Sequence, residues 1–117
     1  MQDFRNLLVW QKAHQLALAT CRVTNDFPRD EVFGLRNMMR KTSIDIPAFI
    51  AEGAAKQNDT EFARPVSGAL GFANRLEYYA VMARDLGFLD LEIHERYESD
   101  LIEVKKMMAG FNRRLNA

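Results

Sequence analysis

The sequence has few cysteines and histidines, no excess of charge of either sign and no long apolar run. Its single cysteine, Cys21, excludes an intramolecular disulfide and a cysteine-ligated metal cluster, and is typical of a reducing compartment. The formal net charge is zero, so the overall charge does not indicate binding to nucleic acid or to a membrane surface. No segment reaches the roughly 18 apolar residues of a membrane span. Residues 1–20 carry early charges and no cleavage site, so we expect no signal peptide and a cytoplasmic protein.

Motifs of common enzyme classes are also missing. The sequence contains no glycine-rich phosphate loop, no nucleophile elbow and no zinc-ligand spacing. A di-iron site in a four-helix bundle needs Glu-x-x-His on two helices. Gln11 occupies the glutamate position before His14, and Leu91 occupies it before His94. We therefore predict that the protein is not an enzyme and binds no cofactor or metal.

Apolar residues recur at helical spacing in four segments, and no segment has the pattern of a strand. The predicted helices are Asn6–Thr24, Glu31–Lys56, Thr60–Leu86 and Leu91–Leu115. Their core-facing stripes are Val9, Ala13, Leu16, Thr20 and Val23; Leu35, Met39, Thr42, Ile46, Phe49 or Ile50, and Gly53; Phe62, Val66, Ala69, Ala73, Leu76, Ala80 and Ala83; and His94, Tyr97, Leu101, Val104, Met108, Phe111 and Leu115. Short connections predict an all-α, antiparallel up-down four-helix bundle that forms one domain, residues 1–117.

The helix ends carry recognisable signals. Pro28 stops the first helix from continuing. Asn58, with Glu61 three residues later, resembles a capping box for the third helix. Gly87 is predicted to end that helix in the left-handed conformation, and Asp90 to cap the fourth helix.

The second and third helices have more apolar surface than one core requires. Scattered apolar residues are normal on a protein surface, but a helix that is apolar on two sides is usually buried on two sides. We therefore predict homo-oligomerisation. The predicted interface comprises Ile44, Pro47, Ala48, Ala51, Phe72, Tyr79, Met82 and Leu86.

Asp45 and Glu52 flank a proline in the second helix and are candidates for a catalytic pair. Seven residues rise about 10 Å along a helix, which is too far for one metal ion or a shared proton. That separation could suit an inverting glycosidase, but such a site would need a cleft beside the helix. Ion pairs with Lys41 and Lys56, four residues away on the same helix, are the simpler expectation. His94 is predicted to be a structural or capping histidine.

Two groups of cations are candidates for contacts with a nucleic-acid backbone. The groups are Arg36, Arg40 and Lys41 on the second helix, and Lys105, Lys106, Arg113 and Arg114 on the fourth. The alternative is a solvated helix face, with favourable cations near a helix C-terminus.

Four motifs, in order along the chain, resemble the 23S rRNA-intervening-sequence proteins, a family of four-helix-bundle proteins. The motifs are LLVWQKAHQL (7–16), FPRDEVFGL (27–35), IDIPAFIAEG (44–53) and ARDLGFLD (83–90). The resemblance implies a bundle that assembles into a ring, typically a homopentamer, and it implies no activity. The sequence departs from the family pattern at Asp45, Phe49, Phe72 and Arg75, where Ser, Asn, Ser and Glu are usual.

Two hypotheses about function follow. The first is a non-enzymatic oligomeric scaffold or adaptor whose partners are copies of itself and a nucleic acid or another protein. The alternative is direct binding of RNA or DNA through the two groups of cations.

Overall fold

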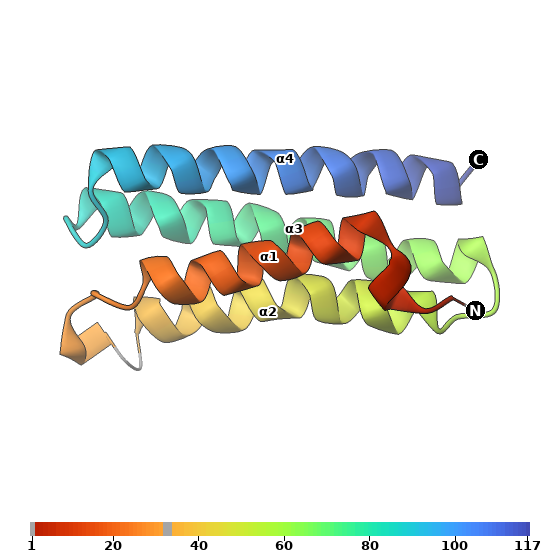
Figure 1. Cartoon of the computed structure of the whole chain (residues 1–117), viewed down its shortest axis with the longest axis horizontal. Helices are drawn as coiled ribbons and strands as arrows, with labels where there is room; N and C mark the ends of the chain where they lie inside the picture. The colour runs from red at the N-terminus through yellow and green to blue at the C-terminus, as the bar shows by residue number, and fades with distance from the viewer. Residues whose placement is uncertain (1, 32–33) are drawn as a thin grey trace.

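The computed structural model describes residues 2–31 and 34–117, which contain four long α-helices and no strand. The helices are α1 (Leu8–Val23), α2 (Leu35–Ala54), α3 (Asp59–Asp85) and α4 (Leu91–Leu115), with short 3-10 turns at Phe4–Asn6 and Arg29–Glu31. Figure 1 shows the helices lying lengthwise beside one another, with both chain termini at the same end. Helices α1 and α3 each pack against α2 and α4. The prediction of an all-α fold with four helices is confirmed.

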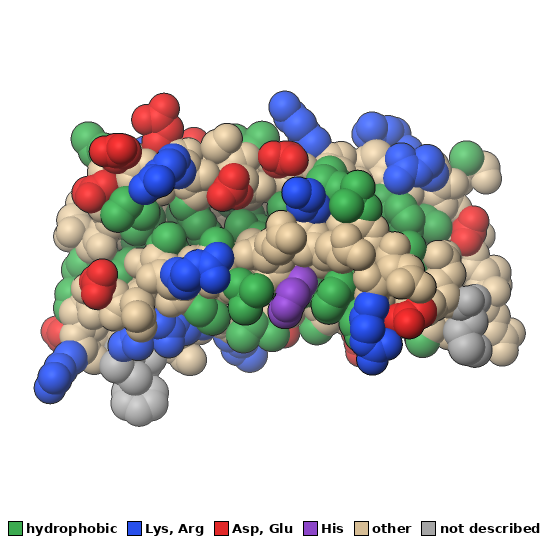
Figure 2. All heavy atoms as spheres, viewed as in Figure 1, with side chains coloured by type: hydrophobic (Ala, Val, Ile, Leu, Met, Phe, Trp, Pro, Cys, Tyr) green, Lys and Arg blue, Asp and Glu red, His purple; other side chains and the backbone are tan. Residues whose placement is uncertain are grey.

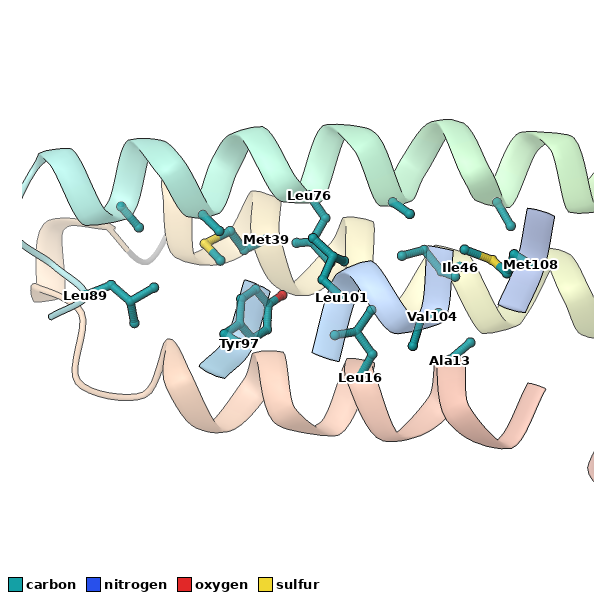
Figure 3. Close-up of a cluster of buried hydrophobic side chains, with 14 of the residues drawn as sticks. Ala13, Leu16, Met39, Ile46, Leu76, Leu89, Tyr97, Leu101, Val104 and Met108 are labelled. Atoms are coloured by element: carbon teal, nitrogen blue, oxygen red, sulfur yellow. The ribbon is translucent and has the colours of Figure 1, made fainter. Parts of the chain in front are cut away.

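Charged side chains cover much of the outer surface, and hydrophobic side chains show between the helices (Figure 2). Inside, the core follows the stripes that the sequence predicts. Every residue of the predicted α3 stripe is buried, and the alanines in it let the neighbouring helices approach closely. Side chains from α1, α2, α3 and α4 meet along the centre of the molecule, Leu16, Ile46, Leu76 and Leu101 among them (Figure 3).

The predicted caps of α3 and α4 are confirmed. The Asn58 side chain accepts a hydrogen bond from the Glu61 amide at 2.9 Å, which is one half of the expected capping box. The Glu61 carboxylate accepts from the Asn58 side-chain amide at 3.1 Å, in place of the backbone N–H of Asn58. Asp90 accepts from the Ile93 amide at 2.9 Å. These contacts satisfy backbone N–H groups that have no partner within the helix.

Gly87 ends α3 as predicted, with a φ of +79°. The Gly87 amide donates to the Arg84 carbonyl at 3.0 Å, and the next amide, of Phe88, donates to Ala83 at 2.9 Å. This pair of hydrogen bonds is a Schellman motif, in which glycine is preferred because it has no Cβ. The chain then turns and enters α4.

Helix α2 begins at Leu35, four residues later than predicted. Glu31 belongs to the preceding 3-10 turn, and its carboxylate accepts a hydrogen bond from the Leu35 amide at 2.9 Å. Glu31 thus stabilises the start of α2 from outside the helix, because an acidic group there complements the helix dipole. The predicted helical residues Val32 and Phe33 lie outside the described residues.

Candidate functional site

The outer face of α2 and α3 carries most of the predicted interface. Ile44 and Leu86 are each 52% exposed and Met82 is 36% exposed, while Phe72 and Tyr79 are half-buried. These side chains lie on two helices that pack against each other. They leave an apolar surface without a covering element in the described part of the chain.

Pro47 is not part of this surface, although the sequence analysis placed it in the interface. Its side chain is buried within the protein, together with Ser43 one turn earlier and Ala54 two turns later. These three positions share one side of α2, because residues four and seven apart lie on the same face of a helix. Pro47 therefore contributes to packing inside the protein.

Two aromatic residues form a pair at the junction of α2 and α3. The rings of Phe49 and Phe72 meet edge to face, with centroids 4.9 Å apart, and the Arg75 guanidinium lies 5.5 Å from the centre of the Phe72 ring. Gly68 makes room for this pair, because a Cβ there would lie 2.9 Å from the Phe49 ring. Three positions that depart from the pattern of the resembled family are therefore neighbours in space.

The ion pairs expected for Asp45 and Glu52 are absent. Among residues 2–31 and 34–117, neither carboxylate forms an ion pair with Lys41 or Lys56. Exposed charges gain little by pairing, and ordering two long side chains costs entropy. Glu52 and Lys56 instead border an open hollow of about 590 Å³ beside Phe49.

Arg40 was predicted to contact nucleic acid, but its guanidinium is engaged within the protein. Its Nε donates to the Thr24 hydroxyl at 2.8 Å, and its Nη2 donates to the Cys21 carbonyl at 3.0 Å. A cation at this position satisfies a free carbonyl at the end of α1 and complements the helix dipole. Arg36 is half-buried nearby, and Lys41 is exposed.

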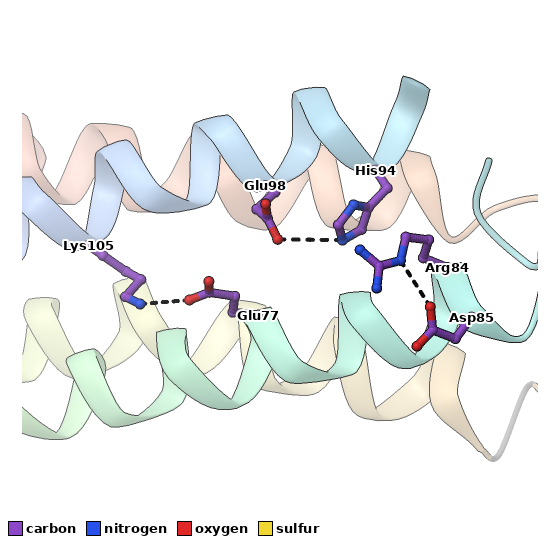
Figure 4. A network of polar contacts seen from close by, with 6 residues as sticks. All are labelled: Glu77, Arg84, Asp85, His94, Glu98 and Lys105. Atoms are coloured by element: carbon purple, nitrogen blue, oxygen red, sulfur yellow. Dashed lines mark hydrogen bonds and ion pairs between the residues drawn. The ribbon is translucent and has the colours of Figure 1, made fainter. Parts of the chain in front are cut away.

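The predicted cations of α4 have different surroundings. Lys105 donates to the Glu77 carboxylate on α3 at 2.6 Å (Figure 4), so its charge is neutralised within the protein. Lys106, Arg113 and Arg114 are exposed, and they have no ion-pair partner among the residues that the structure describes. Lys and Arg side chains gather over the C-terminal half of α4, and acidic side chains over its N-terminal half (Figure 2).

His94 is buried, with 4% of its surface exposed, near the start of α4. Its Nε2 lies 3.7 Å from the Glu98 carboxylate one turn later, and it faces α3 near Arg84 (Figure 4). Over the described ranges, no three His, Cys, Asp or Glu side chains gather as metal ligands. None of the helices in those ranges is both long enough and apolar enough to cross a bilayer.

Comparison with known families identifies the chain. The family model described as 23S rRNA-intervening sequence protein matches residues 5–110, nearly the whole sequence. The chain belongs to this family. The match confirms the resemblance drawn from the four sequence motifs, while the family's description names no activity. A search of curated proteins finds no match.

This 23S rRNA-intervening sequence protein has a second surface feature that the sequence analysis missed. Between the start of α1 and the end of α4 lies a hollow of about 460 Å³, bordered by Leu8, Met107, Phe111 and Arg114 among others. Its two sides are about 100 residues apart in the sequence. The sequence signal for this hollow was Leu8, an apolar residue outside the α1 stripe. In the structure Leu8 is 60% exposed.

Proposed function

We propose that the protein is a non-enzymatic homo-oligomeric scaffold or adaptor. In this proposal the chain folds as one domain, an antiparallel up-down four-helix bundle, and its copies associate through the outer face of α2 and α3. The family resemblance suggests five copies in a ring, and the single cysteine suits the cytoplasm. The observation that carries the proposal is the exposed apolar surface of Ile44, Met82 and Leu86.

The physical reason is the free energy gained when that apolar surface is removed from water. Burying apolar area contributes about 25 cal/mol per Å², and contiguous apolar patches on a soluble protein commonly mark contacts with another molecule. Ala48 and Ala51 add small side chains beside Ile44 on α2. They would allow a neighbouring helix to approach closely. In a symmetric ring, every copy would use this same face for its contact.

We expect the wild-type protein to have the mass of an oligomer in light scattering, near 68 kDa for five copies of 13.5 kDa. Ile44→Glu with Leu86→Glu should reduce the mass to that of one chain, because two charges would have to be buried at the contact. Leu91→Glu is the matched control: Leu91 is 73% exposed on α4, a helix that contributes no residue to the predicted interface. A wild-type protein that remains monomeric at every concentration would refute the proposal.

The second candidate function is direct binding of RNA or DNA, favoured by the exposed, unpaired cations on α4. Arg113→Glu with Arg114→Glu should weaken binding to a labelled oligonucleotide and make it less dependent on salt, since each lost phosphate contact lowers the salt slope by roughly 0.7–0.9. Arg22→Glu, an exposed site on α1, is the control. Equal affinity of wild type and the double variant would exclude these residues as phosphate contacts.

A further inference from the structure

The hollow between α1 and α4 combines an apolar floor with a basic rim. Leu7, Met107 and Phe111 are half-buried there, and Leu8 is 60% exposed. The charged residues that border it are Lys106 and Arg114, and no acidic residue does.

The residues of α4 that line the hollow lie along one face of the helix. They are Lys106, Met107, Gly110, Phe111 and Arg114. Lys106 and Arg114 are eight residues apart, about 12 Å along the helix axis, with Met107 and Phe111 between them. Gly110 places no side chain in the middle of the floor, and a Cβ there would meet only the ends of the Arg113 and Arg114 side chains, at 3.7 and 3.8 Å.

We propose that this hollow binds an acidic amphipathic helix of a partner protein. The apolar face of such a helix would cover Leu8, Met107 and Phe111, and carboxylates two turns apart would reach Lys106 and Arg114. Two residues spaced by seven or eight in the partner lie on one face and span the same distance of about 10–12 Å. The partner's apolar face would thus cover the apolar floor, and its carboxylates would pair with the basic rim.

A nucleic acid fits the hollow less well. Binding of single strands relies on aromatic faces for stacking, but the Phe111 ring already has two partners within the protein. It meets Phe62 edge to face at 5.2 Å, and the Arg114 guanidinium lies 5.7 Å from its centre. The rest of the floor is aliphatic. The inference adds a partner to the proposed adaptor role, and it holds for a monomer as well as for an oligomer.

The test uses a fluorescent, stapled helical peptide of about four turns, with leucines on one face and glutamates flanking them two turns apart. Fluorescence anisotropy should show binding to the full-length wild-type protein, and at least about tenfold weaker binding of the same peptide with glutamine for glutamate. Arg114→Glu and Gly110→Leu should each weaken binding by at least about tenfold. Arg114→Glu reverses a charge of the rim, and Gly110→Leu fills the hollow.

The matched control is Arg96→Glu, an exposed arginine on the same helix that does not border the hollow. It lies ten residues, about 15 Å along the helix axis, from Lys106, so it should change affinity by less than about threefold. A peptide with lysine in place of only the glutamate that faces residue 114 should recover binding to Arg114→Glu, because it keeps the glutamate that faces Lys106. Circular dichroism checks the fold of each variant, and light scattering checks the oligomer, so a failure here is distinguishable from a failure of the proposed scaffold.

Three results would overturn the proposal. One is equal affinity for the glutamate and glutamine peptides, or no binding of either. Another is an equal loss of affinity in Arg96→Glu and Arg114→Glu. The third is a labelled oligonucleotide that binds more tightly than the peptide and is weakened by Gly110→Leu, which would assign the hollow to nucleic acid.

Discussion

Gly53→Ala is expected to lower the free energy of unfolding by about 3 kcal/mol. A Cβ at residue 53 would lie 2.5 and 2.8 Å from two carbons of the Phe62 ring, and 3.2 Å from the Phe62 carbonyl oxygen. The ring has little room to move, because Phe62 is 2% exposed and packs edge to face against Phe111. The carbonyl belongs to α3 itself, so α2 and α3 would have to separate. This cost exceeds the helix-propensity gain of alanine over glycine, about 1 kcal/mol.

Urea unfolding measures this prediction, with Gly71→Ala as its matched control. Gly71 also lies within a helix, but a Cβ there meets no atom within 4 Å. Gly71→Ala should therefore raise the free energy of unfolding by about 0.5–1 kcal/mol. An increase in the stability of both variants would show that α2 does not approach Phe62 this closely.

The helical stripes could be predicted because burial in this fold follows a regular period. Positions spaced by three and four residues on each helix face the same core, so a local pattern suffices. Leu76 on α3 and Leu101 on α4 are both fully buried, as their stripes require. The caps Asn58 and Asp90 could be predicted for the same reason, since each acts within three residues of itself.

The roles of individual charges could not be predicted in this way, because they depend on a second helix. Arg40 bonds Thr24 and Cys21, 16 and 19 residues earlier, and Lys105 bonds Glu77, 28 residues earlier. A sequence pattern gives no distance between such residues. The sequence analysis therefore treated both cations as candidates for external contacts. The structure leaves Lys106, Arg113 and Arg114 as the stronger candidates.

The departures from the family pattern also show that a sequence does not reveal which residues of different helices are in contact. Phe49 and Phe72 are 23 residues apart, and each alone breaks an expected polar position. In the structure they form one edge-to-face pair above Gly68. Aromatic pairs of this geometry contribute about 0.5–1.5 kcal/mol beyond their buried area. Phe49 and Phe72 thus form one apolar contact, which neither position indicates by itself.

The second prediction with a large expected effect concerns the buried hydrogen bond between Thr20 on α1 and Tyr97 on α4. The Thr20 hydroxyl donates to the Leu16 carbonyl at 2.8 Å and lies 2.6 Å from the Tyr97 hydroxyl. Thr20 has one hydroxyl hydrogen, which the Leu16 bond uses, so Tyr97 donates to Thr20. Thr20 is completely buried and Tyr97 is 3% exposed, so water does not replace a lost partner.

Thr20→Val should lower the free energy of unfolding by about 2 kcal/mol, because it leaves the Tyr97 hydroxyl buried without an acceptor. Tyr97→Phe should cost less, about 1 kcal/mol, since Thr20 keeps its bond to Leu16. The double variant should be more stable than Thr20→Val alone, because no orphaned hydroxyl remains. A double-mutant cycle from urea unfolding measures this coupling, and additive costs would contradict it.

The pH dependence of stability gives an independent readout of the same pair. Burial raises the pKa of the Tyr97 hydroxyl above its ordinary value. Because the pKa is higher in the folded protein than in the unfolded chain, the neutral phenol stabilises the fold fully below about pH 10 and progressively less above it. Above that pH, the wild type should lose up to about 1.4 kcal/mol per pH unit more than Tyr97→Phe. Parallel stability curves for the two proteins at alkaline pH would mean that Tyr97 reaches solvent and ionises without unfolding.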